Sequence, residues 1–379
     1  MSETTTKGQD FESALEQASQ SVAEFDDHRS GFIPWLQHLL HTNPSLVPLI
    51  VLVLSTLSLG VYIDWGAISV GLGIASPEEV SNGSFRFFKA FTLTLILQQV
   101  QIVGVLAAAQ TLIILTAGID LSVGAIAVLC SVIMGQFTFR YGIPPAVSIA
   151  IGLAFGTAIG AASGWLVSRV KLPPFIVTLG MWQIVLAANY LYSANETIRS
   201  QDIEARAPLL QLLGTKYTIY GATFTLGVIS MLIIAFALAY ALRSTPWGRH
   251  VYAVGDDPEA AELAGVNRHR TLISVYMLAG LICAFAGWVM IGRFGSVSPS
   301  ATTGVIGNIQ AITAVVIGGI SLFGGRGSIL GALFGALIVG VFELGLRMAG
   351  ADPQWTFLLI GVLIIGAVAV DQWIRKVSI

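Results

Sequence analysis

The chain has 379 residues, of which 55% are hydrophobic and only 11% are charged, and its formal net charge at pH 7 is −2. A soluble domain carries about 25% charged residues, so this composition excludes an ordinary soluble protein. Apolar stretches of about 20 residues, long enough to cross a bilayer as a helix, recur along most of the chain. We therefore predict an all-α, polytopic membrane protein.

The first 31 residues are polar, with seven acidic residues against Lys7 and Arg29. They lack the positive start and apolar centre of a secretory signal. Residues 32–41 are amphipathic and are expected to lie on the membrane surface. We predict that residues 1–45 form an acidic cytoplasmic tail with an interfacial helix, and that residues 46–379 form the transmembrane domain.

Ten apolar segments are predicted to span the membrane, which places both chain ends on one side. Eleven Lys and Arg residues then share the side of the tail and eight lie on the other, and four of the eleven fall within residues 243–270. This bias predicts a cytoplasmic position for that segment. The predicted spans are 46–63, 90–116, 121–139, 145–168, 174–193, 219–242, 272–291, 309–323, 328–346 and 355–371.

The polar segment 243–270 separates two spans and is predicted to carry its own short helix outside the membrane. An Asp at the N-cap, a Pro at the first helical position and a Gly in a left-handed conformation at the end are typical helix boundaries. Small alanines on one side of such a helix favour docking into a groove on a partner. The residues of this predicted docking helix are Asp257, Pro258, Glu259, Ala260, Ala261 and Gly265.

Glycines recur every four residues in two spans, and in lipid such strips let helices approach closely. We interpret them as static packing surfaces, with a pivot or gate as the alternative. The pattern G-I-x-L-x-x-G occurs at 118–124 and again at 319–325, which indicates internal duplication unless the match arose by chance. The span count makes the repeats parallel, whereas a re-entrant or broken segment near 90–125 would invert them. The glycines are Gly152, Gly156, Gly160 and Gly164, and then Gly327, Gly331 and Gly335.

Asp120 is an isolated acid between two apolar stretches, where a charge is costly unless it is paired or lies at a helix end. We expect Asp120 and Ser122 to accept hydrogen bonds from the free amides that open the third span. The alternative is a substrate or gating group. Glu343 and Arg347 lie four residues apart and predict an ion pair within one helix.

Most other polar residues in the spans are uncharged amides, accompanied by aromatic rings. As a set they favour a neutral, polyhydroxylated solute over an ion, because amides bond hydroxyl groups and ring faces cover the apolar side of a sugar. Each of them alone fits hydrogen bonding between helices at least as well. The candidates for a substrate path are Gln98, Gln101, Gln110, Asp120, Asn189, Asn308 and Gln310.

The sequence lacks the residues that ion-driven transport, ATP binding, metal binding or catalysis would require. The spans are nearly free of the acidic groups that proton- or sodium-driven carriers use. The glycine cluster at 324–328 lacks the lysine and the spacing of a phosphate-binding loop. Cys130 and Cys283 lie within apolar stretches, so we expect neither a disulfide nor a metal site. No catalytic residue and no cofactor are predicted.

Four segments resemble permease subunits of bacterial ABC monosaccharide importers of the ribose, xylose and fructose branch, with fructose permeases the most similar in appearance. The resemblance implies a multi-pass permease of the inner membrane that works as a homodimer among lipids. It implies an ATPase subunit that binds the ATP and a periplasmic sugar-binding protein as partners, and no nucleic acid. The segments are 117–129, 172–181, 245–266 and 318–346.

In that family the Glu-Ala-Ala…Gly helix engages the ATPase, which the resemblance carries onto Glu259, Ala260, Ala261 and Gly265, with Asp257 and Pro258 shaping the helix. Two alternatives stay open. One is a secondary sugar carrier or facilitator, which the scarcity of acids in the spans disfavours. The other is an intramembrane enzyme acting on lipid-linked sugars, for which Asp120 alone is thin support.

Overall fold

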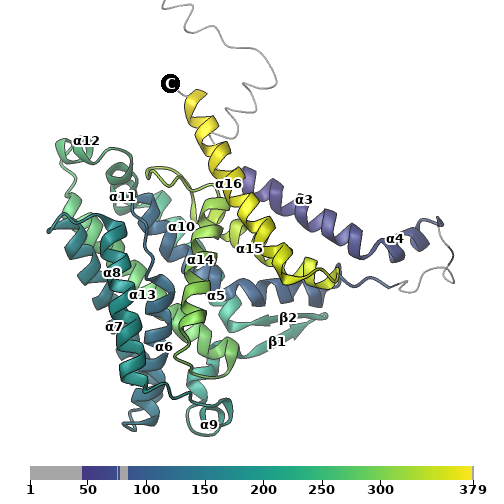
Figure 1. The fold of residues 1–379 in the computed structure, drawn as a ribbon, viewed down its shortest axis with the longest axis horizontal. Coiled ribbons are helices and arrows are strands. Elements are labelled where there is room, and N and C mark those ends of the chain that lie inside the picture. The colour runs from purple at the N-terminus through teal and green to yellow at the C-terminus, as the bar shows by residue number, and fades with distance from the viewer. Residues whose placement is uncertain (1–44, 75, 77–83, 378–379) are drawn as a thin grey trace, which may run out of the picture. The chain divides into compact units, whose positions relative to one another are not determined.

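The structure is a computed structural model, which describes residues 45–74, 76 and 84–377; the predicted tail and surface helix, up to residue 44, lie outside this part. Ten helices correspond to the ten predicted spans (Figure 1). These are α3 (Leu46–Ile63), α5 (Ala90–Leu115), α6 (Val123–Phe139), α7 (Pro145–Ser168), α8 (Pro174–Ser193), α10 (Leu226–Ser244), α13 (Arg268–Phe294), α14 (Ala301–Ile317), α15 (Ile329–Met348) and α16 (Pro353–Val377).

Among the described residues, seven of these helices are long and apolar enough to cross a membrane, while α6, α14 and α16 carry shorter apolar helical stretches. The all-α, polytopic class is therefore confirmed. The connections contain further short elements. They are α4 (Trp65–Gly71), α9 (Ser200–Arg206), the 3-10 helix η1 (Pro208–Gly214), β1 (Lys216–Ile219), β2 (Ala222–Thr225), α11 (Pro246–Asp256) and α12 (Pro258–Leu263).

The sixth and eighth spans differ most from their predicted boundaries. The sixth span was placed at 219–242, but β1 and β2 pair as an antiparallel hairpin and α10 begins only at Leu226. Tyr220 and Gly221 both have positive φ, which a tight hairpin turn requires, and the β-branched residues on either side favour strands. The eighth span was placed at 309–323, but α14 covers 301–317 because Gly319, at φ +73°, ends it in a left-handed conformation.

The glycine strip of α7 packs against α13, the most extensive helix pairing in the described chain. A Cβ on Gly160 would collide with the Tyr276 carbonyl, and one on Gly280 would collide with the Gly156 carbonyl. Such contact brings the two backbones together without side chains between them, as expected for helices in lipid. On α15 the corresponding contacts come from Gly331 and Gly335, whereas Gly327, counted in the predicted strip, precedes the helix.

Both ends of the bundle are tied by contacts between distant segments. At one end the Gly325 amide, after α14, donates a hydrogen bond of 3.0 Å to the carbonyl of Leu115, the last residue of α5. At the other end Ile198, near α9, pairs with Val297 in an isolated bridge. Helices α11 and α12 lie at the first end and α9 at the second (Figure 1).

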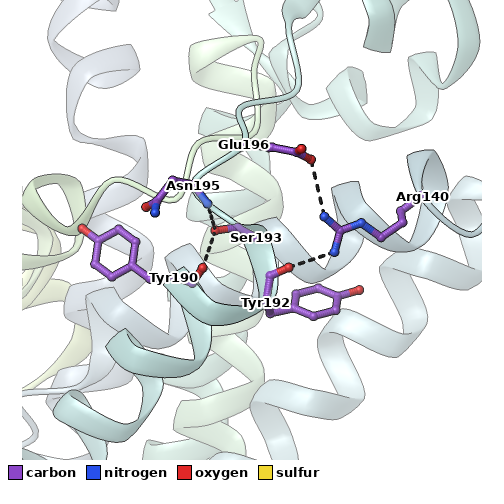
Figure 2. Close-up of polar contacts among 6 residues, drawn as sticks. All are labelled: Arg140, Tyr190, Tyr192, Ser193, Asn195 and Glu196. Atoms are coloured by element: carbon purple, nitrogen blue, oxygen red, sulfur yellow. Dashed lines mark hydrogen bonds and ion pairs between the residues drawn. The ribbon is translucent and has the colours of Figure 1, made fainter.

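At the second end, Figure 2 shows the Arg140 guanidinium between the Tyr192 carbonyl and the Glu196 carboxylate, at 3.0 and 3.4 Å. The Ser193 hydroxyl bonds the Tyr190 carbonyl at 3.5 Å and accepts from the Asn195 amide at 3.1 Å. Arg140 follows α6 and Glu196 follows α8, so these contacts join the two helix ends. An exposed pair of this kind contributes about 1 kcal/mol or less.

Asp64, between α3 and α4, fixes the start of α5 through backbone hydrogen bonds. Its carboxylate accepts from the amides of Arg86, Phe87 and Phe88 at 2.7 to 3.1 Å. Burial by itself would raise the pKa of Asp64, but these amides and the Arg86 charge hold the pKa of this carboxyl below its usual value of 3.8.

We predict that Asp64→Asn lowers stability at about pH 7 by roughly 1–2 kcal/mol, because hydrogen bonds to a charged acceptor are lost. The folded pKa is depressed, so this stabilisation is present above the unfolded pKa and disappears as the pH falls through the folded pKa. Thermal unfolding at about pH 7 and pH 3 measures the difference, which should be smaller at the lower pH because the stabilisation declines between the unfolded and the folded pKa. Asp352→Asn, an exposed acid in the connection before α16, is the control; an equal or pH-independent loss in both variants would contradict the assignment.

Candidate coupling surface and polar groups of the spans

The predicted docking helix exists as α12, and its predicted boundaries are confirmed. The Asp257 carboxylate accepts hydrogen bonds of 3.0 Å from the amides of Glu259 and Ala260, and Pro258 occupies the first turn. Gly265 has φ +85°, and the amides of Gly265 and Val266 donate back to the carbonyls of Glu262 and Ala261. This pair of bonds is a Schellman C-cap, so both ends of a six-residue helix are closed.

One side of α12 packs inward and the other is free. Ala261 is buried against Val254 and Leu272, so it is not a partner-facing residue, contrary to the expectation that both alanines face a groove. Glu259 and Ala260 are exposed, and Leu263 is 90% exposed. Leu263 was missed in the sequence; an apolar residue directly between a predicted cap and its closing glycine was the available signal.

A second helix, α11, directly precedes α12 and was not predicted from the sequence. It begins at Thr245, whose hydroxyl accepts from the Gly248 amide at 3.2 Å, followed by Pro246. This is the same cap-and-proline pattern that predicted α12. Its far end abuts the bundle: a Cβ on Gly255 would collide with the Leu115 carbonyl, and the Tyr252 hydroxyl donates to the Gly327 carbonyl at 2.8 Å.

The connection between α5 and α6, residues 116–122, lies inside the bundle without helical structure. After α5 the chain turns at Ala117, with φ +58°. Backbone groups buried there need partners, since an unpaired one is costly away from water. Thr178 of α8 donates to the Ile119 carbonyl at 3.0 Å. The Gln110 amide, oriented with its nitrogen toward the Asp120 carbonyl, exchanges two bonds of 3.0 and 3.2 Å with the Asp120 backbone.

Asn308 of α14 completes this set. Its side chain accepts from the Gly124 amide in the first turn of α6 and donates to the Leu121 carbonyl. The prediction that Asp120 and Ser122 cap the free amides of α6 is therefore wrong. The Asp120 carboxylate instead accepts hydrogen bonds from the amide and the hydroxyl of Ser122, at 2.6 Å each, and neither side chain bonds the amides of the helix. A Cβ at Gly124 would collide with the Gly304 carbonyl, so glycine is needed for α14 to come this close.

These contacts make α6 a short helix that starts inside the bundle, and we propose that it is the broken span, one of the two alternatives left open. It has 17 residues, so it rises about 25 Å, less than the hydrocarbon core of about 30 Å. Its first turn lies beside Asn308, which is in the middle of α14 (Ala301–Ile317). Its amino end, which carries the partial positive charge of the helix dipole, thus lies within the bundle.

The remaining candidate path residues fall into two groups. Gln98 donates to the Thr223 carbonyl at 2.7 Å, and Gln101 bonds Thr225 at 2.8 Å, so both hold the hairpin against α5. The other two, Asn189 and Gln310, line cavities. The seven residues therefore do not form one continuous lining.

Asn189 donates to the Pro299 carbonyl at 2.9 Å, while its buried oxygen has no partner within the described chain. It lines a cavity of about 10 Å³ with Trp182, which is room for one water at most. Gln310 lines a larger pocket of about 230 Å³ among α14, α15 and α16, together with Thr313. Arg347 and Glu343 border that pocket as the predicted ion pair, at 3.4 Å.

Comparison with known proteins agrees with this architecture. Residues 92–368 match the family described as branched-chain amino acid transport system / permease component, and the chain belongs to it. The chain is 62% identical, over the full length of both proteins, to the fructose import permease protein of Rhizobium meliloti. The resemblance to sugar importer permeases is confirmed, and the protein is a multi-pass membrane permease.

Two more distant relatives are ribose import permease proteins. That of Bacillus subtilis strain 168 is 36% identical over 76% of this chain and 86% of the relative. That of Escherichia coli strain K12 is 36% identical over 77% of this chain and 89% of the relative. No solved structure matches the chain.

We predict that Asn308→Leu destabilises the protein by about 2 kcal/mol or more, because it leaves a buried amide and a buried carbonyl without partners. Gln310→Leu, two residues along the same helix, should have little effect, since that side chain lines a pocket. Thermal unfolding of the purified protein in detergent compares the two variants. Equal stability of both with the parent chain would show that the Asn308 contacts do not support the broken span.

Proposed function

We propose that the chain is the permease subunit of an ATP-binding-cassette importer of the bacterial inner membrane, with a cytoplasmic ATPase, a periplasmic sugar-binding protein and a second copy of itself as partners. The observation that carries the proposal is an exposed helix, α12, closed at both ends and mounted on α11, which abuts the membrane bundle. The permease itself has no catalytic role, and ATP binds to the partner subunit. The relatives named above are import permeases, which supports this role.

The contacts suggest how movement at α12 reaches the spans. The end of α11 rests on the last carbonyl of α5 and on the turn at Gly324 and Gly325. The non-helical segment 116–122 follows α5 directly and leads into α6. Displacement of α12 by a closing ATPase would therefore be passed through α11 to the broken span, since close-packed backbones transmit strain.

The proposed cargo is a neutral monosaccharide of the fructose, ribose or xylose type. The full-length relative at 62% identity is named for fructose import, which favours that sugar. We assign the cargo path to the neighbourhoods of Gln310 and Asn189, whose side chains line cavities. Gln98, Gln101, Gln110, Asp120 and Asn308 support the path by holding backbone groups.

Uptake of labelled fructose into proteoliposomes tests the whole assignment. We expect accumulation only when ATP, the ATPase subunit and the sugar-binding protein are all present, because the chain has no phosphate-binding loop of its own. Omitting each component in turn is the control. Accumulation driven by a proton gradient without ATP would favour the alternative, a secondary sugar carrier or facilitator.

Three variants test the docking face of α12. Leu263→Asp and Glu259→Lys change exposed side chains, and Gly265→Pro is incompatible with the positive φ at that position. We expect each to remain in the membrane but to lose ATPase co-purification and transport by about tenfold or more, as hot-spot residues do. Ile219→Asp, an exposed residue of the hairpin at the other end, is the matched control. Retained co-purification in all three variants would refute the docking assignment.

A further inference from the structure

Gln183, near the middle of α8, lies on the outer surface of the bundle. The helix packs chiefly against α6 and α7, so its opposite side is free within the described chain. Figure 1 shows α8 at the edge of the bundle. Gln183 is exposed on the free side of the helix, and its side chain makes no hydrogen bond to another described residue.

An exposed amide at this depth is unusual among the described spans. In the middle third of each of them, the other exposed side chains carry neither an amide nor a charge. Gln98, Gln101, Gln110 and Asn308 are buried and have partners within the chain. Hydrocarbon offers an amide no partner, so polar residues in spans almost always face protein or a water-filled cavity. A partner outside the single chain therefore covers Gln183.

The residues beside Gln183 leave room for another helix. Gly180 and Ala187 lie about one turn before and after it on the same face, and both are exposed. A Cβ at Gly180 would have nothing within 4 Å, whereas a Cβ at Gly156 or Gly160 of α7 would collide with α13. The space over Gly180 is therefore free in the single chain, and a second backbone can approach it closely.

We propose that this face of α8 packs against the same face of a second copy of the chain, about a twofold axis parallel to the spans. An amide both donates and accepts, so two Gln183 side chains related by that axis bond each other reciprocally. Ile176, Ile184 and Leu191, exposed at 57%, 64% and 85%, supply the apolar contacts around the pair. The proposal rests on the homodimer of the proposed function and adds which helix joins the two copies.

The proposed interface adjoins the non-helical segment 116–122. The Thr178 hydroxyl, on the inner side of the same helix, donates to the Ile119 carbonyl at 3.0 Å. Each copy therefore has only α8 between this segment and the twofold axis. Movement of the segment in one copy reaches the other copy through the paired α8 helices.

Cross-linking of introduced cysteines locates the face directly. The parent chain is a suitable background, because Cys130 and Cys283 are 0% and 1% exposed. In membranes that contain the complete importer, Gln183→Cys should form a disulfide-linked dimer on mild oxidation with copper phenanthroline. Ile233→Cys, an exposed position in the middle of α10, is the matched control and should stay monomeric, as should the parent chain.

Two substitutions test the contacts without a cross-link. Gln183→Leu should weaken the association of the purified full-length permease about tenfold, because it removes hydrogen bonds between helices. Gly180→Leu should weaken it at least as much by holding the backbones apart, although the new side chain starts in open space within the single chain. Ile233→Ala should associate as the parent does. Energy transfer between labelled copies in liposomes, at decreasing ratios of protein to lipid, measures the association.

The outcomes separate this proposal from the proposed function. If the parent chain associates but Gln183→Cys forms no linked dimer, or if both leucine variants associate normally, only the assignment of α8 is overturned. Rapid labelling of Gln183→Cys by a membrane-impermeant maleimide, without cross-linking, also overturns it, since the side chain then faces water. If the parent chain does not associate and no variant cross-links, the homodimer of the proposed function is wrong as well.

Discussion

Backbone amides and carbonyls inside a bilayer must find partners within the protein, and this requirement shapes the centre of the molecule. Residues 116–122 leave the helical ladder between α5 and α6, so the chain supplies side chains to replace it. Gln110, Thr178 and Asn308, from three different helices, each bond that segment. The hydrogen-bonding groups of these polar side chains, which would be unfavourable if left unpaired in lipid, are thereby satisfied by the non-helical segment 116–122.

The same break lies next to the parts that face the cytoplasmic partner in our proposal. Leu115, just before the non-helical segment, receives the Gly325 amide and touches Gly255 of α11. Because the residues at these points are glycines, no side chain separates the two backbones, and they are in direct contact. In our proposal such a contact passes movement at the end of α11 to α5, and discontinuous helices are common where transporters change conformation.

Local signals predicted the helix α12 well. The Asp-Pro start of α12 and its closing Gly265 depend on neighbours in the chain, so they could be recognised before the structure was known. Asn308 could not be assigned in this way, because its partner at Gly124 lies 184 positions earlier. The hairpin at 216–225 was missed because its apolar residues merge with those of α10, although Tyr220-Gly221 and the flanking threonines are turn and strand signals. The ten apolar helices could be located because hydropathy marks them along the chain, although only seven of those described are long and apolar enough to cross a membrane.

The hydrogen bonds between side-chain amides and the backbone also limit which groups the proposed path can offer to a cargo. A residue such as Gln110 or Asn308, already bonded on both ends of its amide, has little left with which to bind a sugar. The groups that remain around Asn189 and Gln310 are few and uncharged, apart from one ion pair at the pocket edge. A passage with few binding groups holds its solute weakly, and weak binding allows release on the far side. In our proposal, selectivity therefore comes from the separate protein that captures the sugar before it enters.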